Sequence, residues 1–153
     1  MEEKFVKSYI GRNADEMYEK MNKKGSFNVF CMLFGIIYMI YRKMYLVAFG
    51  TFLINTLLLS DILGNIKGGT LILGIILGFL FYPLYKWHIT RKIDKFKQQT
   101  SDEDEINNMC IKKGGISIPA LVITLVLLFI SIAIIAFGIL IVNVAMESGM
   151  LTQ

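Results

Sequence analysis

The sequence predicts an all-α integral membrane protein, with three transmembrane helices, one re-entrant or interfacial helical segment, and a cytoplasmic amphipathic N-terminal helix pair. Hydrophobic residues make up 55% of the 153 residues and charged residues only 18%, which is too apolar for a soluble domain of this length. The apolar residues are also clustered. They form four uninterrupted runs, at 27–41, 44–59, 70–85 and 116–146.

Residues 1–25 are predicted to form two short amphipathic helices. Apolar side chains recur at helical spacing along this segment: Phe5, Val6, Tyr9, Ile10, Ala14, Met17, Tyr18 and Met21. Gly11 interrupts the stripe, Asn13 and Glu16 have the spacing of a capping box, and Gly25 ends the second helix. Basic residues in the segment favour its binding to an anionic membrane surface. Docking of the stripe on the rest of the protein, or on a second copy, explains it equally well.

Positive charge determines the expected topology. The segment 88–115 is a cytoplasmic loop with short helices, because Lys and Arg are concentrated in and just before it and such residues mark cytoplasmic loops. The transmembrane segment 117–143 then carries the C-terminus outside. Working backward, 69–87 enters from outside and 44–63 begins inside, so that the N-terminus is cytoplasmic. Every basic residue except Lys67 then lies in the cytoplasm.

The segment 27–41 does not span on this arrangement. Lys24 before it and Arg42 after it both belong in the cytoplasm, so the segment begins and ends on one side. Its length suits a re-entrant or interfacial segment, and Gly35 at its middle supplies a bend. The residues expected to set the topology and mark the membrane surface are Arg42, Lys43, Tyr41, Tyr45 and Trp87.

Local signals add detail to the helices. Pro83 predicts a kink near the end of its span. A charged helix is expected to continue that span over 91–99. Ser101 is expected to cap the next helix, and the pair Ser117 and Pro119 to open the last one.

Small and polar residues inside the spans indicate contacts between helices. Gly74 and Gly78 have the small-xxx-small spacing that lets membrane helices approach closely, either within the chain or in a homo-oligomer. Asn55 is the deep amide of the spans, and we expect it to bond to another helix. Cys31 and Cys110 lie in a membrane run and a charged loop, so we expect no disulfide. We predict no catalytic, cofactor-binding or metal-binding residues, since no recognisable motif is present.

His88 is the single histidine of the chain. Lys86, Arg91 and Lys92 flank it, and we expect these positive charges to lower its pKa. We therefore interpret it as an interfacial side chain and not as an acid sensor.

Several short strings resemble one known family. They are Tyr9-Ile10-Gly11-Arg12-Asn13, Ser26-Phe27-Asn28, Phe34-Gly35 and Tyr41-Arg42-Lys43-Met44-Tyr45. Over roughly the first third of the chain they resemble the domain of unknown function 2628 family of small bacterial membrane proteins. Family members typically have Trp and Pro where Val29 and Ile36 stand here. The resemblance implies a bacterial inner-membrane location and carries no known activity.

These observations lead to a functional expectation. We expect a non-enzymatic accessory, scaffold or regulatory subunit that acts through protein–protein or protein–lipid interaction. A homo-oligomeric pore or channel is the alternative, motivated by Gly74, Gly78 and Asn55. The expected partners are the lipid bilayer, including anionic lipids, and either a second copy or another membrane protein. Nucleic acid is not expected, because the basic residues lie beside membrane segments.

Overall fold

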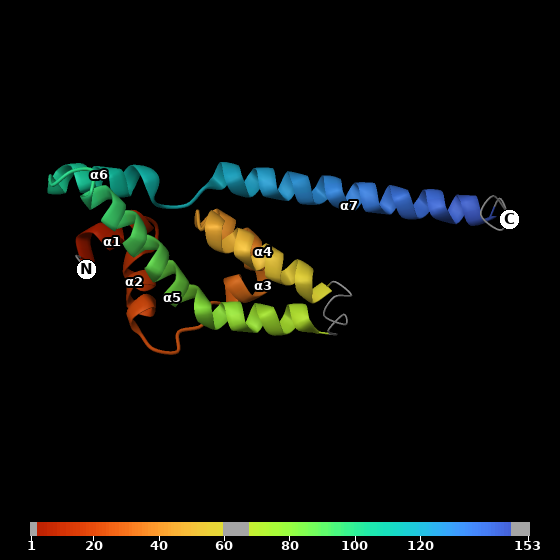
Figure 1. The fold of residues 1–153 in the computed structure, drawn as a ribbon, viewed down its shortest axis with the longest axis horizontal. Coiled ribbons are helices and arrows are strands. Elements are labelled where there is room, and N and C mark those ends of the chain that lie inside the picture. The colour runs from red at the N-terminus through yellow and green to blue at the C-terminus, as the bar shows by residue number, and fades with distance from the viewer. Residues whose placement is uncertain (1–2, 60–67, 148–153) are drawn as a thin grey trace. The chain divides into compact units, whose positions relative to one another are not determined.

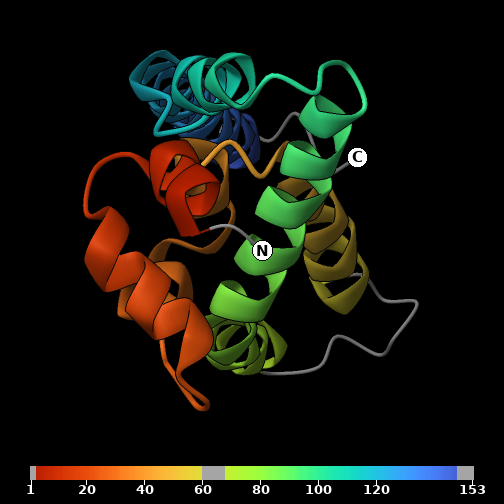
Figure 2. The ribbon, with the colours of Figure 1, turned by 90° about the vertical axis from the view of Figure 1, so that its left-hand side faces the viewer.

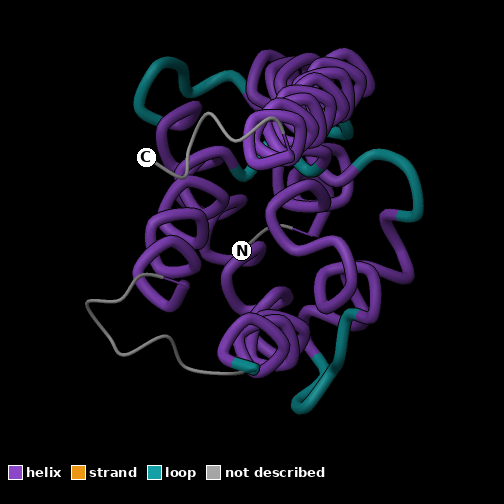
Figure 3. The backbone as a smooth tube through the Cα atoms, turned by 90° about the vertical axis from the view of Figure 1, so that its right-hand side faces the viewer, coloured by secondary structure: helices purple, strands orange, loops and turns teal. Residues whose placement is uncertain are grey.

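The computed structural model describes residues 3–59 and 68–147, and all regular structure in these ranges is helical (Figures 1 and 3). The helices are α1 (Glu3–Ile10), α2 (Ala14–Asn22), α3 (Val29–Tyr41), α4 (Tyr45–Leu59), α5 (Gly69–Lys97), α6 (Glu103–Lys113) and α7 (Ile118–Glu147). The all-α prediction is confirmed for this part of the chain. Among the described residues, two helical stretches are long and apolar enough to cross a membrane. One is α5, and the apolar part of the other lies in α7. Residues 60–63 of the predicted span 44–63 lie outside the described residues.

The chain divides into two compact units, Met1–Ser117 and Ile118–Gln153. The described part of the second unit is α7, which is 30 residues long, follows Ser117 and carries Pro119 in its first turn, as predicted. Hydroxyl side chains of α7 hydrogen-bond to the backbone of the same helix. Thr124 and Ser131 each donate to the carbonyl oxygen four residues earlier, both at 2.8 Å.

Helix α5 is the centre of the first unit. It contacts α1, α2, α3, α4 and α6, and Figure 2 shows it with α1 and α2 on one side and α4 on the other. Its buried side chains include Phe81, Tyr85 and Ile89, which are among the least exposed of the unit. Helix α5 bends along its length in Figure 1, and Pro83 lies inside it. The charged helix expected after the span is a direct continuation of α5 to Lys97.

The amphipathic stripe of α1 and α2 packs inside this unit. Its buried side chains are Phe5, Val6, Tyr9, Ile10, Met17 and Met21. Helix α1 contacts α5 and α6, and α2 contacts α5. Of the two explanations for the stripe, docking on the protein is therefore correct, and these side chains are not free to enter a membrane surface.

Two of the predicted caps are wrong. Asn13 adopts a left-handed conformation with φ 62°, whereas a capping residue needs an extended one, and its side chain makes no capping hydrogen bond. Glu16 instead pairs with Lys20 at 2.6 Å, and α2 ends at Asn22. Helix α6 is capped by Asp102 rather than Ser101. The Asp102 carboxylate accepts from the backbone N–H of Asp104 at 3.1 Å.

Helix α3 is broken where the sequence predicts a bend. Gly35 has φ 42° and ψ −111°, a conformation that interrupts the helix and that glycine adopts without steric cost. The helix begins at a real cap, because the Asn28 side chain accepts from the Cys31 N–H at 2.8 Å. The Asn28 N–H donates to the carbonyl oxygen of Gly78 at 2.9 Å. This bond ties the start of α3 to α5.

Candidate functional site

A tight turn joins α3 to α4 and holds Arg42, Lys43 and Met44. The N–H of Lys43 donates to Ile40 and that of Met44 to Met39, at 3.0 and 2.9 Å. Lys43 has φ 59°, a left-handed conformation that usually falls to glycine after a helix. Lys43 therefore carries a backbone strain that glycine would avoid.

The Arg42 side chain is buried, with 7% of its surface exposed. Its guanidinium carbon lies 5.9 Å from the ring centroids of Tyr38, Tyr41 and Tyr85, so three aromatic faces surround the charge. Within the described residues, its Nε and Nη1 atoms and the Tyr85 hydroxyl have no hydrogen-bond partner. The sequence pattern marks Arg42 as a topology signal, but its charge lies in the core of the first unit.

The Lys43 ammonium group binds the end of α6. It donates to the carbonyl oxygen of Lys113 at 3.3 Å and to that of Gly114. These carbonyls lie at the negative end of the helix dipole, which favours a cation. Two backbone bonds reinforce the junction, from Ser117 to Tyr41 at 2.9 Å and from Gly115 to Tyr9 at 2.6 Å.

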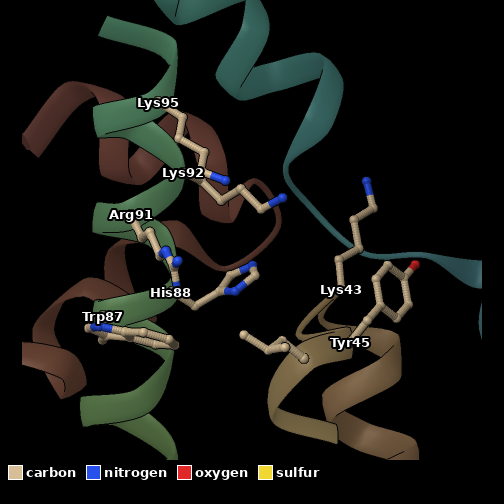
Figure 4. A pocket seen from close by; sticks show the side chains of 8 residues that line it. Lys43, Tyr45, Trp87, His88, Arg91, Lys92 and Lys95 are labelled. Carbon is tan, nitrogen blue, oxygen red and sulfur yellow. The ribbon is translucent and has the colours of Figure 1, made fainter. Parts of the chain in front are cut away.

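A pocket of about 230 Å³ lies beside this turn (Figure 4). It lies between the start of α4 and the charged half of α5. Its lining residues are Lys43, Tyr45, Leu46, Trp87, His88, Arg91, Lys92 and Lys95. Four of these side chains are basic and none is a carboxylate, so the pocket, which we call the basic pocket, attracts anions.

His88 contributes no positive charge to the basic pocket near neutral pH. Burial, together with the nearby Lys92 charge, lowers the pKa of His88 to about 4. The direction of this shift agrees with the prediction, but burial is the larger cause. The Tyr9 hydroxyl lies 3.4 Å from Nε2 of His88, and burial raises the pKa of Tyr9, so this contact joins two neutral groups.

Two of the aromatic residues predicted to mark the membrane surface, Tyr45 and Trp87, line the basic pocket. Tyr45 is 51% exposed and Trp87 is 47% exposed. The guanidinium of Arg91 lies 5.5 Å from the Trp87 ring centroid, which orients both side chains. The structure therefore brings Lys43, Tyr45 and Trp87 to one site, while Arg42 and Tyr41 belong to the adjacent buried cluster.

The predicted interface glycines face the same chain. A Cβ atom on Gly74 would lie 2.9 Å from the carbonyl oxygen of Met32, and one on Gly78 would lie 2.4 Å from a ring carbon of Phe27. Asn55 is half-buried, and its Oδ1 has no hydrogen-bond partner in the described part of the chain. We expected Asn55 to bond to another helix, but within the described residues its Oδ1 accepts no such bond.

Sequence reasoning does not single out Arg91, Lys92 and Lys95 as residues that line one pocket. The signal that could have found it is the helical spacing of Trp87, Arg91 and Lys95, with Lys92 one turn after His88. In the sequence, Arg91, Lys92 and Lys95 count as topology charges, and Arg91 and Lys92 also as neighbours of His88. Within 3–59 and 68–147, no cluster of three or more His, Cys, Asp or Glu side chains could hold a metal ion. Both cysteines are free thiols.

A family model described as "Protein of unknown function (DUF2628)" matches residues 4–91. The match is longer than the stretch that carries the recognisable strings, and it includes both the α3–α4 turn and most of α5. All lining residues of the basic pocket except Lys92 and Lys95 fall within it. No curated protein and no solved structure matches the chain.

Proposed function

We propose that this chain, which belongs to the DUF2628 family because the match covers more than half of its length, is an integral protein of the bacterial cytoplasmic membrane. In this proposal 44–63, 69–87 and 117–143 span the bilayer. The broken helix α3 is a re-entrant or interfacial segment. The N-terminus and the charged half of α5 are cytoplasmic, and the C-terminus is outside.

The distribution of exposed apolar side chains supports this placement. In the first unit, almost all large apolar residues that are exposed lie between Val29 and Leu80, on α3, α4 and the first half of α5. After Leu80, the described residues of this unit add only Trp87 and Ile111. A water-soluble surface rarely carries so large an apolar patch, whereas a lipid-facing surface requires one.

The function we propose is binding, in an accessory, scaffold or regulatory role and without catalysis. The observation that carries it is the basic pocket, which lies where the apolar half of α5 gives way to its charged half. Exposed cations beside exposed aromatic rings favour a partner that is anionic and lies at the membrane surface.

A homo-oligomeric pore is the second candidate. Its support is Asn55, a half-buried amide on α4 whose Oδ1 is covered and has no hydrogen-bond partner in the described residues. Gly74 and Gly78 give the pore less support, because they pack against Met32 and Phe27 of the same chain. Dye or ion flux from liposomes holding a verified oligomer tests this alternative. Flux that Asn55→Leu alters favours a pore, and silent liposomes argue against it.

Photo-cross-linking in native membranes tests the binding role. A photoreactive residue replaces Lys95 in the basic pocket, and a matched one replaces Asn108, which is exposed on α6. We expect defined adducts, with protein or lipid, at position 95 and not at 108. If neither adducts at position 95 nor self-association is detected, the binding role is wrong.

A further inference from the structure

We propose that the basic pocket binds the phosphate-bearing headgroup of an anionic phospholipid, an inference that rests on the membrane placement proposed above. The first argument is charge. Lys43, Arg91, Lys92 and Lys95 line the pocket, and no carboxylate forms an ion pair with them in the described part of the chain. The neutral His88 leaves this positive field unchanged near pH 7. An anion is the ligand that balances such a site.

The second argument is the apolar side of the same pocket. Leu46, Tyr45 and Trp87 line it and are 64%, 51% and 47% exposed. A soluble phosphate ester would use the cations but would leave these three side chains in water. A phospholipid uses both, with its phosphate on the lysines and its glycerol and upper acyl chains on the aromatic and aliphatic groups.

The third argument is size and continuity. A pocket of about 230 Å³ accommodates a headgroup but not a whole lipid. The acyl chains must therefore lie outside it. Leu46 is followed on α4 by Phe49 and Leu53 at helical spacing, and these side chains are 61% and 47% exposed. They form an apolar track that leads away from the basic pocket along the proposed membrane-spanning part of α4.

Trp87 makes the pocket directly observable, because it is the single tryptophan of the chain. The full-length protein in a neutral detergent is titrated with phosphatidylglycerol or phosphatidylcholine that carries brominated acyl chains, which quench indole fluorescence at contact. We expect phosphatidylglycerol to quench Trp87 at a lower mole fraction. We also expect this preference to weaken as salt is added, because Arg91, Lys92 and Lys95 are exposed.

Variants assign the preference to the pocket. Lys92 and Lys95 are both exposed, so replacing each with Gln removes charge without disturbing the core. Each lysine at an anionic surface contributes about a fivefold factor, so the double variant should bind phosphatidylglycerol roughly 10- to 30-fold more weakly. Replacing both with Arg keeps the charge and should keep the preference. Arg12→Gln with Lys112→Gln, an equal charge change outside the pocket, should have no effect.

Three results would overturn the inference. Equal quenching by the two lipids removes the headgroup preference. Equal loss in the pocket variant and the Arg12 and Lys112 control assigns it to overall charge. Reversal of quenching by soluble glycerol phosphate at the lipid's own concentration identifies a soluble phosphate ester as the ligand. Protein adducts at position 95 in the cross-linking experiment would still support the binding role, so the two proposals can fail separately.

Discussion

The ammonium group of Lys43 donates a hydrogen bond to the carbonyl oxygen of Gly114. The two residues are 71 positions apart, and the bond joins the α3–α4 turn to the end of α6. The same residue has a left-handed backbone, with φ 59°. A glycine would fit the backbone better but would not reach α6.

Removing the Lys43 ammonium should loosen α6. Lys43→Met keeps the aliphatic stem and deletes the charged donor, so we expect a loss of about 1.5–3 kcal/mol, the range for hydrogen bonds of charged groups. Hydrogen exchange over 103–113 in detergent should rise in this variant. Lys112→Met, on the exposed side of α6, is the matched control. Equal protection in both variants would show that the bond does not hold α6.

Gly78 should not tolerate a side chain. The added Cβ of Gly78→Ala would lie 2.4 Å from the Phe27 ring, so this ring must move off α5, at a cost of about 1–3 kcal/mol. Gly50→Ala is the control, because a Cβ at that position would meet nothing within 4 Å and alanine favours helix by up to about 1 kcal/mol. The apparent Tm in detergent should fall for Gly78→Ala and hold or rise for Gly50→Ala. The reverse order would contradict the packing.

The Asn28 cap should be replaceable only by another cap. Asn28→Ala removes the acceptor of the Cys31 N–H and should cost about 0.5–2 kcal/mol. Asn28→Ser keeps a side-chain oxygen and should recover part of that loss. Thermal unfolding of the two variants measures the difference. Equal destabilisation by Ala and Ser would mean that volume, and not the cap, matters at this position.

Stability should fall as the pH is lowered, because His88 is buried in its neutral form. Its pKa in the folded protein is about 4, below the ordinary value of 6.5, so the unfolded chain binds the proton first as pH falls. The stability that neutral, buried His88 gives the folded protein is fully present above pH 6.5 and is lost as the pH drops from 6.5 toward 4. His88→Gln should flatten this part of the stability profile relative to the wild type. Parallel profiles between these pH values would contradict the assignment.

The proposed topology can be read from cysteine labelling. In a chain with Cys31 and Cys110 replaced by alanine, a cysteine in place of Gln153 should react with a membrane-impermeant reagent in intact cells. One in place of the exposed Asn108 should react only after permeabilisation. Labelling of position 108 from outside would reverse the orientation. The native cysteines are buried, so their removal needs a check of folding by circular dichroism.

Local features of the chain were predictable from sequence because they depend on neighbouring residues. The helical class, the break at Gly35 and the start of α7 all follow from apolar runs, glycine freedom and helix-end preferences. The two cap predictions were wrong because they rested on residue type alone. Asn13 and Ser101 each have a suitable residue type, but the backbone angle and the competing Asp102 decided the outcome.

The sequence by itself determined that this is a helical chain with apolar segments and clustered positive charge, because composition and periodicity are local. Only the tertiary structure decided what the charges do. Arg42 and Lys43 are adjacent in sequence and form one topology signal there, yet Arg42 lies among tyrosines while Lys43 binds α6 and borders the basic pocket. Burial and ligand geometry depend on segments far apart in the chain, and no local pattern encodes which segments meet.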